Sequence, residues 1–561
     1  MAARGPVVAL AETLADALLR NDPFLASYLG VSGYDDAVPD LSPQARAAWR
    51  DSLVDVLIRC EQLEPDAAGL DDQVLLGAVH DHATWALAAV DSRVGEFSVA
   101  AVPLGGLPFM LLVMARASVT SASSASAVLS RCQRMPAYVD QCAGQLAAAA
   151  RGGLLPVAPL VQDAIKQLRD YVTHPARDPL LALRPPGGWD GADGWRDELA
   201  RAVRDGIYPA LGRYIDLLAD LLPRSRPPER AGLLYVPGGV ASYACCIRNG
   251  TTLASDADQI HRIGLTALAE VEERIAELGG RILAAGSAAE VMARLRGDPS
   301  LTAATGQDVM SRAAAAIGRA ETQLAEMFHP PLPPPCRVEP MPPQVAESGA
   351  PPMYSPPARD GSRPGAYLVN CSNPGAAGAW ALEATAFHEA VPGHHGQLAR
   401  LQLLPGLPLL LTAFGVVPHS EGWGLYAERL ADESGLYSDD MQRLGALGME
   451  SFRAVRLVVD TGLHARGWSR ARALEFALAH TPMPESFLAS EIDRYIASPG
   501  QALGYLIGQR ELLRLREDAR RQLGTAFDIR DFHSAVLDHG ALPLPVLAQV
   551  VQAWITSASP T

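Results

Sequence analysis

The sequence predicts a mainly α protein with one small β-sheet. Along most of its 561 residues, apolar side chains recur at three- and four-residue spacing among many alanines, which is the pattern of amphipathic helices. Hydrophobic residues make up 48% of the chain, enough for a sizeable core. No period of roughly 20–50 residues recurs, so the sequence excludes a solenoid.

Six segments in the first half of the chain carry the helical pattern. Two of them have helix-start signals: Ser42-Pro43 combines a capping side chain with a proline in the first turn, and Ser255-Asp256 offers another cap. The predicted helices span Val7–Leu19, Asp40–Glu61, Gln73–Val90, Ala125–Arg151, Trp195–Leu222 and Asp256–Ala285.

A proline-rich stretch interrupts this pattern after His329. Thirteen prolines fall between residues 330 and 364, and proline cannot donate the backbone hydrogen bond that a regular helix needs. Within and after this stretch, Cys336–Glu339 and Ala366–Asn370 are short, extended and apolar, so we predict strands there. Helices resume at Ala379. The expected regions are 1–329, N-terminal and helical; 330–378, a Pro-rich connector with short strands; and 379–561, C-terminal and helical.

Composition and charge exclude several function classes. The chain has 47 basic and 62 acidic residues and a formal net charge of −15, whereas nucleic-acid binders concentrate basic residues on one face. Its seven cysteines are scattered without a CxxC pair, which argues against a disulfide framework or a thiolate zinc site. No apolar run reaches the ~20 residues that cross a bilayer, and residues 1–20 lack a signal-peptide pattern. We therefore expect a soluble, cytoplasmic protein that binds neither nucleic acid nor membrane, and the sequence carries no signal for its oligomeric state.

A histidine cluster is the strongest functional signal in the sequence. His388, Glu389, His394 and His395 fall within eight residues of an otherwise apolar helical segment. Imidazoles are common zinc ligands, and a glutamate beside the first histidine can act as general base. The alternative, in which His395 only interacts with the last carbonyls of a helix, suits a single histidine better than the group of four. We therefore predict a metal site here.

The spacing of this cluster departs from HExxH, in which two ligands lie one helical turn apart. On an unbroken helix, His395 would lie about two turns from His388 on the same face. Pro392 and Gly393 disfavour an unbroken helix, because one removes a donor and the other relaxes the backbone. A bulge at that point would instead bring His394 into the second ligand position, and we prefer His394.

A third ligand is expected further along the chain, because catalytic zinc takes three protein ligands and keeps one position open. Glu421 begins a helical segment that contains Gly and Trp, a suitable place for a carboxylate to project into a packed site. The alternative is that Glu421 only complements the dipole at a helix N-terminus. Glu428, about two turns further on, and His419, expected in the preceding loop, are competing ligands.

Four segments resemble the bacterial DUF885 family: HEAVPGHHGQ at 388–397, EGWGLYAERL at 421–430, DTGLHARGW at 460–468 and PGQALGYLIGQREL at 499–512. Similarities around residues 22–42 and 247–252 extend the resemblance over nearly the whole chain. That family is placed among gluzincin-like metallopeptidases. The resemblance therefore implies a large helical gluzincin-like fold, with a small β-sheet beside the active-site helix and a deep cleft.

The resemblance also implies roles for individual residues. When the HEAVPGH segment is interpreted as an HExxH-type motif with two residues inserted before the Gly-His pair, His394 matches the second ligand. The resemblance then assigns Zn2+ to His388, His394 and Glu421, and the general base to Glu389.

Two residues are candidates to stabilise an oxyanion, which is often a large contribution to catalysis. Tyr505 resembles the tyrosine in the late Gly-Tyr segment of thimet-type peptidases, and the alternative is an aromatic core residue. His464 lies four residues after Asp460, so one helical face could pair them and orient the imidazole. The alternative for this pair is a purely structural role.

Four further residues are candidates for substrate binding. Arg453 and Arg456, three apart on a predicted helix, could bind a substrate carboxylate or pair with structural carboxylates. Ala366–Asn370 is expected to be the edge strand of the sheet, which could hold an extended peptide by main-chain hydrogen bonds. Asn370 could add a side-chain contact or form a turn. Tyr495, shortly before a Ser-Pro-Gly turn, is the last pocket candidate.

Together these features predict a zinc-dependent hydrolase that cleaves a peptide or amide bond of a small substrate, with Glu389 as general base. Two alternatives stay open: an enzyme that acts on a non-peptide amide or a specialised metabolite, and a metal-binding protein without catalysis. The presence of Glu389 argues against the second, because a structural zinc closes its fourth position with protein ligands.

Overall fold

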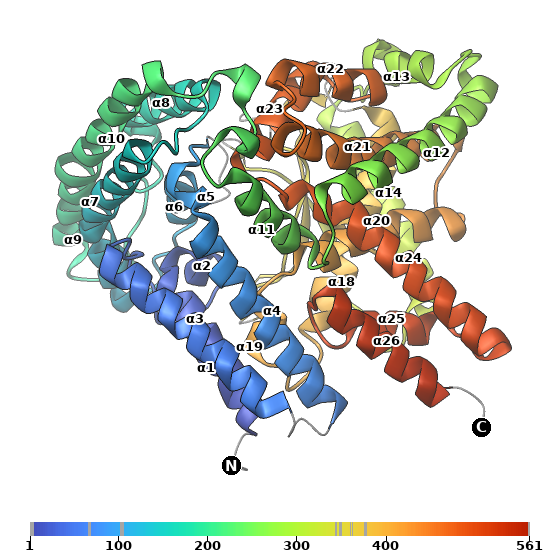
Figure 1. Cartoon of the computed structure of the whole chain (residues 1–561), viewed down its shortest axis with the longest axis horizontal. Helices are drawn as coiled ribbons and strands as arrows, with labels where there is room; N and C mark the ends of the chain where they lie inside the picture. Colours follow the sequence, from blue (N-terminus) through green and yellow to red (C-terminus); the bar gives the residue numbers. More distant parts are fainter. Residues whose placement is uncertain are drawn as a thin grey trace.

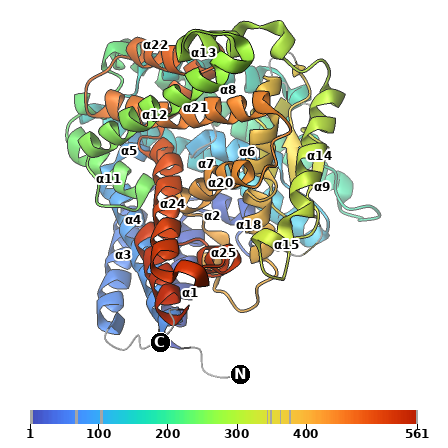
Figure 2. The ribbon, with the colours of Figure 1, turned by 90° about the vertical axis from the view of Figure 1, so that its right-hand side faces the viewer.

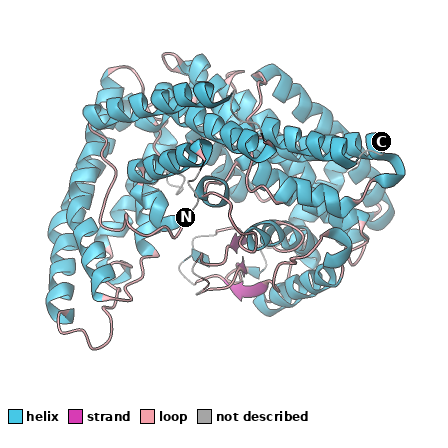
Figure 3. Ribbon diagram, turned by 90° about the horizontal axis from the view of Figure 1, so that it is seen from below, coloured by secondary structure: helices cyan, strands magenta, loops and turns pink. Residues whose placement is uncertain are grey.

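A computed structural model of the chain has the mainly α architecture that the sequence predicts (Figure 1). It describes residues 5–64, 69–100, 106–342, 345–346, 350–359, 361, 363–374 and 378–558. Within these residues, the strands form one small three-stranded sheet, which helices surround (Figure 3). No helix in these ranges has both the length and the apolar character needed to cross a bilayer.

The helices before the sheet are amphipathic and bury their apolar faces against one another. They are α1 (Pro6–Asn21), α2 (Pro23–Tyr28), α3 (Pro43–Leu63), α4 (Leu70–Ser92), α5 (Val94–Phe97), α6 (Gly106–Ala115), α7 (Ala122–Arg151), α8 (Ala158–Thr173), α9 (Ala192–Arg201), α10 (Tyr208–Leu221), α11 (Gly239–Thr251), α12 (Ala257–Leu283), α13 (Ala288–Gly297), α14 (Gly306–Thr322) and α15 (Leu324–Met327).

The helices after the sheet carry most of the predicted site residues. They are α17 (Leu382–Glu389), α18 (His394–Leu401), α19 (Leu409–Ala413), α20 (Val417–Glu433), α21 (Asp440–His464), α22 (Arg470–His480), α23 (Glu485–Ala497), α24 (Gly504–Leu523), α25 (Ile529–Leu537) and α26 (Leu544–Ala558).

The six predicted long helices are all present, and their start signals act as expected. The Ser42 side chain caps α3, with Pro43 in its first turn. Asp256 caps α12 in a capping box, in which side chain and backbone at the helix start bond reciprocally. The segment predicted as one helix over 195–222 consists of α9, a π-helical piece at Ala202–Ile207, and α10.

The sheet differs from its prediction in one respect. Strands β1 (Arg337–Pro340) and β3 (Ala366–Val369) confirm the two predicted segments, but β2 (Met353–Ser355) was not predicted. The strand order is β1-β3-β2, with β1 parallel and β2 antiparallel to β3. The prediction that Ala366–Asn370 forms an edge strand is therefore wrong, because β3 pairs on both sides and β2 lies at the edge.

Two helix pairs connect distant parts of the chain. In Figure 2, α12 lies along α21, and α24 runs beside α20. Glycines permit these close approaches: a Cβ on Gly264 of α12 would lie 2.8 Å from the Leu457 side chain of α21. A Cβ on Gly508 of α24 would collide with the Pro418 carbonyl of α20.

A buried carboxyl in α21 makes the stability of this packing depend on pH. Asp460 is fully buried, and it accepts hydrogen bonds from the Tyr243 hydroxyl at 2.6 Å and from the Gly500 backbone N–H at 3.1 Å. Burial outweighs these bonds and raises the pKa of Asp460 to about 7. The folded protein thus retains a proton that the unfolded chain releases near pH 4.

We therefore predict that Asp460 costs stability as pH rises from about 4 to 7, since only the unfolded state is deprotonated there. Asp460→Asn removes the titration. The free energy of unfolding of wild type minus that of the variant should fall by about 1–4 kcal/mol over this range, as measured by urea unfolding. Asp193→Asn, which removes the titratable carboxyl of a side chain that is 95% exposed, is the control. A wild-type-minus-variant difference that stays constant with pH for Asp460→Asn would contradict the prediction.

Candidate metal centre

The helix that carries the histidine cluster is broken where the sequence predicts. Helix α17 ends at Glu389 and α18 begins at His394, and the Gly393 N–H donates to the Phe387 carbonyl at 3.1 Å. A Cβ on Gly393 would collide with the His388 carbonyl, so only glycine fits this close approach of backbone to backbone. The break turns the His394 side chain towards His388.

His388, His394 and Glu421 converge on one point. Each offers one ligand atom, and these atoms all lie within 4.8 Å of one another. Glu421 Oε2 is 3.5 Å from His388 Nε2 and 3.6 Å from His394 Nε2. The two imidazole rings stand nearly perpendicular, with centroids 4.8 Å apart. His388 is buried, whereas the His394 and Glu421 side chains keep 13% and 24% exposure, so the centre is open on one side.

His395 lies outside this cluster and supports it. Its Nδ1 is 2.9 Å from the Tyr354 hydroxyl, and its Nε2 is 2.6 Å from the Pro334 carbonyl. Because a carbonyl only accepts, Nε2 carries the proton and Nδ1 accepts from Tyr354. Both ring nitrogens are thus engaged, and the structure favours His394 as the second ligand.

Glu428, a competing ligand in the sequence, instead orients His388. Its Oε1 accepts from His388 Nδ1 at 2.8 Å, and the other ring nitrogen, Nε2, is directed at Glu421. Carboxylates that bind the far nitrogen of a ligand histidine fix its tautomer and raise its basicity. His419, the other competitor, lies in the first turn of α20 rather than in a loop, and its Nδ1 accepts from the Leu542 backbone at 2.7 Å.

Several residues between Glu421 and Glu428 on α20 contact the metal centre directly. The Trp423 indole N–H donates to the Pro392 and Gly393 carbonyls at 2.9 and 3.2 Å, which ties α20 to the break between α17 and α18. A Cβ on Gly424 would lie 2.5 Å from the His388 ring, so glycine leaves room for the imidazole. This stretch of α20 therefore supplies a ligand candidate, the indole that holds the break and a partner for His388.

The general-base candidate is held by a strand that the sequence did not reveal. Glu389 Oε2 accepts from the backbone N–H of Tyr354 on β2 at 2.8 Å. The same tyrosine bonds His395 through its hydroxyl. Tyr354 thus ties the edge strand to both His395 and Glu389. The only sequence signal for this role is that Tyr354 lies in a three-residue segment between two Pro-Pro pairs.

The electrostatics of the centre suit a cation. Burial opposes the charge on His388, but hydrogen bonds to Glu421 and Glu428 outweigh it and raise the pKa of His388 to about 9. Burial likewise opposes ionisation of Glu421, yet bonds to the two histidines hold the pKa of its carboxyl well below its usual range. A negative carboxylate therefore faces two imidazoles, and positive charge is stabilised between them.

Tyr505 lies near this centre. Burial and then the neighbouring Glu421 carboxylate raise the pKa of its phenol. Its ring stacks on the Arg456 guanidinium at 4.2 Å from the ring centroid. Its role as an oxyanion donor stays a prediction.

His464 does not have the environment expected of an oxyanion donor. Its Nδ1 accepts from the Leu233 N–H and its Nε2 donates to the Tyr495 carbonyl, both at 3.1 Å. Burial lowers the pKa of His464 to about 3, so the ring is neutral and has no N–H left to donate. The predicted pair with Asp460 does not form, because Asp460 bonds Tyr243 and Gly500 instead.

The substrate-binding candidates are mostly engaged within the protein. Arg456 donates to the Tyr495 hydroxyl at 3.1 Å and to Glu491 at 2.9 Å, and Tyr495 donates to Glu491 at 2.8 Å. Asn370 donates to two loop carbonyls and accepts from Ser372, the turn role that its sequence also allowed. Arg453 faces Glu428 at 3.8 Å.

Two imidazoles and one carboxylate, with ligand atoms this close, fit a zinc ion that keeps one position open. The fold and the site thus define a mainly α protein with a candidate His-His-Glu metal centre.

The chain belongs to the DUF885 family, described as a bacterial protein of unknown function, which matches residues 23–551. A crystal structure of a "putative lipoprotein" from Colwellia psychrerythraea has a TM-score of 0.89 and 27% identity, covering 98% of this chain and 99% of its own. A "putative lipoprotein of unknown function" from Shewanella oneidensis has a TM-score of 0.76 and 17% identity, covering 98% and 100%; this likeness shows the fold alone. No curated protein matches the chain.

We predict that His394→Ala removes the bound metal, whereas His395→Ala keeps the metal and lowers the unfolding free energy. His394→Ala should lose stoichiometric zinc, as measured by elemental analysis after purification without chelator, because a ligand is removed. His395→Ala should retain zinc but lose about 1–3 kcal/mol of unfolding free energy, because the Tyr354 hydroxyl and the Pro334 carbonyl lose their partner. Zinc lost only from His395→Ala would reverse the ligand assignment.

Proposed function

We propose that this protein is a zinc-dependent hydrolase of peptide or amide bonds, of the gluzincin type. The observation that carries the proposal is the convergence of His388, His394 and Glu421, with the carboxylate of Glu389 adjoining the first ligand. Bound zinc supplies two things to such a site: a lower pKa for water and a polarised scissile carbonyl.

Glu389 is the proposed general base. It follows His388 directly, and its Oε2 is fixed by the Tyr354 N–H of β2 at 2.8 Å. In the proposed reaction, Glu389 takes the proton of the attacking water and delivers it to the leaving amine. A positioned carboxylate that shuttles a proton in this way distinguishes a hydrolase from a protein that only stores metal.

Tyr505 is the proposed donor to the developing oxyanion. His464 is no longer a candidate, because backbone groups engage both of its nitrogens. Tyr505 lies close enough to Glu421 for that charge to act on its phenol, and Arg456 packs on its ring from one side. The stacked guanidinium holds the ring in place, so the hydroxyl needs little reorganisation to donate.

The proposed substrate is a small peptide or amide. The β2 edge ends beside Glu389, so an extended substrate could pair with this strand through main-chain hydrogen bonds. The two solved neighbours are described as lipoproteins, whereas the sequence predicts a cytoplasmic location; the location of this chain stays a prediction.

We predict that Glu389→Gln abolishes hydrolysis without loss of zinc. The amide keeps the shape and can still accept from the Tyr354 N–H, but it cannot take a proton, so turnover should fall by about 10²–10⁴ or more. The assay is mass-spectrometric product analysis of a mixed peptide library, with zinc content measured in parallel. Glu339→Gln on β1, the opposite edge of the sheet from β2, with a side chain that is 47% exposed, is the matched control. Undiminished turnover in zinc-loaded Glu389→Gln would rule out the role.

We predict that Tyr505→Phe lowers kcat by about 10²–10³, with KM changed only a few-fold, because the hydroxyl acts on the transition state and not on the bound substrate. Steady-state kinetics on a peptide identified from the library measures both constants. Tyr208→Phe removes a hydroxyl that bonds Asp178 in the N-terminal helical region, and should affect kcat far less. Equal losses in the two variants would indicate a structural role for Tyr505.

A further inference from the structure

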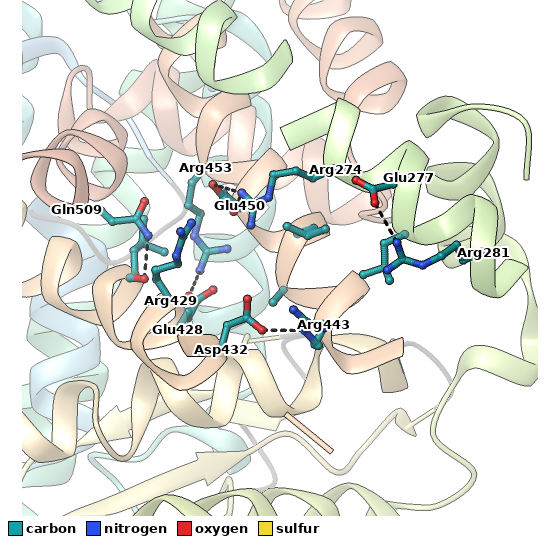
Figure 4. Close-up of a pocket in the computed structure, with 14 residues that line it drawn as sticks. Arg274, Glu277, Arg281, Glu428, Arg429, Asp432, Arg443, Glu450, Arg453 and Gln509 are labelled. Atoms are coloured by element: carbon teal, nitrogen blue, oxygen red, sulfur yellow. Dashed lines mark hydrogen bonds and ion pairs between the residues drawn. The ribbon is translucent and has the colours of Figure 1, made fainter. Parts of the chain in front are cut away.

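A cavity of about 260 Å³ lies between α12, α20, α21 and α24 (Figure 4). It is next to the metal centre, because Glu428 both lines it and accepts from His388 Nδ1. Five arginines and four carboxylates line this cavity, and a fifth carboxylate, Glu433, pairs with one of these arginines. The reaction proposed above uses none of its lining residues directly, since Glu428 acts only through His388.

Four of the five arginines already have a carboxylate partner at hydrogen-bond distance. These partly exposed pairs are Arg274–Glu450 at 2.9 Å, Arg281–Glu277 at 2.9 Å, Arg443–Asp432 at 2.8 Å and Arg429–Glu433 at 3.2 Å. They form a rim around the cavity, and their charges compensate one another.

Arg453 is the exception. Its side chain is 8% exposed, and its Nη2 is 3.8 Å from Glu428 Oε1, too far for a hydrogen bond. Its Nη1 contacts only the Met449 sulfur at 3.8 Å, a weak acceptor. Its Nε is buried and has no hydrogen-bond partner among the residues that the structure describes. Glu428, the nearest carboxylate, is already bonded to His388.

A buried guanidinium with unmatched N–H groups is costly, and native proteins normally satisfy such groups. Arg453 borders a space large enough for a small molecule, and its planar fork of donors matches two oxygens of a carboxylate or a phosphate.

We infer that this cavity binds a small oxyanion, a carboxylate or a phosphate, through Arg453. The site is distinct from the metal centre, and the inference does not rest on the proposed hydrolase function. The ligand class follows from the unmatched donors of Arg453 and the cavity volume together.

The test is calorimetric titration of the full-length protein with sodium succinate and, separately, with inorganic phosphate. Sodium chloride holds the ionic strength constant and serves as the reference anion. We expect saturable one-to-one binding of at least one oxyanion, and the two titrations distinguish a carboxylate from a phosphate ligand. Absence of saturable binding for both, or equal binding of chloride, would overturn the inference.

Three variants locate the binding. Arg453→Met should weaken affinity by about 10–100-fold, since one charge-assisted pair is lost. Ala446→Phe keeps the arginine but fills the cavity that Ala446 lines, so it should weaken binding at least about tenfold and carries the test if Arg453→Met does not fold. His394→Ala should leave oxyanion affinity unchanged, which separates this site from an anion on the metal. Unchanged affinity in Ala446→Phe, or loss in His394→Ala, would contradict the assignment.

Discussion

The close approach of α17 to α20 is the constraint on which the candidate centre depends. The His388 ring lies against the α20 backbone at Gly424, where a Cβ would come within 2.5 Å of it. At this separation, the imidazole meets Glu421 with one nitrogen and Glu428 with the other. A side chain at position 424 would push the helices apart, and both contacts would lengthen together. Packing and chemistry are therefore set by the same glycine.

Acidic side chains lie along one face of α20, from the metal centre towards the interior of the protein. Glu421, the ligand candidate, is followed two turns later by Glu428, which His388 bonds and Arg453 faces. Buried charges of this kind are weak contributors to stability, because desolvation offsets their attraction. Their presence inside a close-packed helical body is therefore better explained by a functional role than by a contribution to the stability of the fold. The Glu428 carboxylate therefore borders both the metal centre and the arginine-lined cavity.

Local signals in the sequence account for much of the fold and part of the site. The cap at Ser42 and the choice of His394 both follow from nearby residues, since capping side chains and a Pro-Gly step act on their own backbone. Strand β2 could not be predicted, because three residues between prolines show no periodicity. The role of Glu428 and the engagement of His464 depend on groups far away in the chain, and residue spacing carries no information about them.

The indole of Trp423 has a consequence for how an ion would enter the centre. Its N–H bonds the Pro392 and Gly393 carbonyls, so protein contacts alone hold the break that positions His394. The same tryptophan lies on the helix that carries Glu421, so one contact fixes the second and third ligand candidates relative to each other. Little conformational entropy is then lost on capture, and the affinity reflects coordination more than ordering of the chain. The proposed zinc would then bind a preformed receptor, whose framework the contact between Trp423 and the helix break holds.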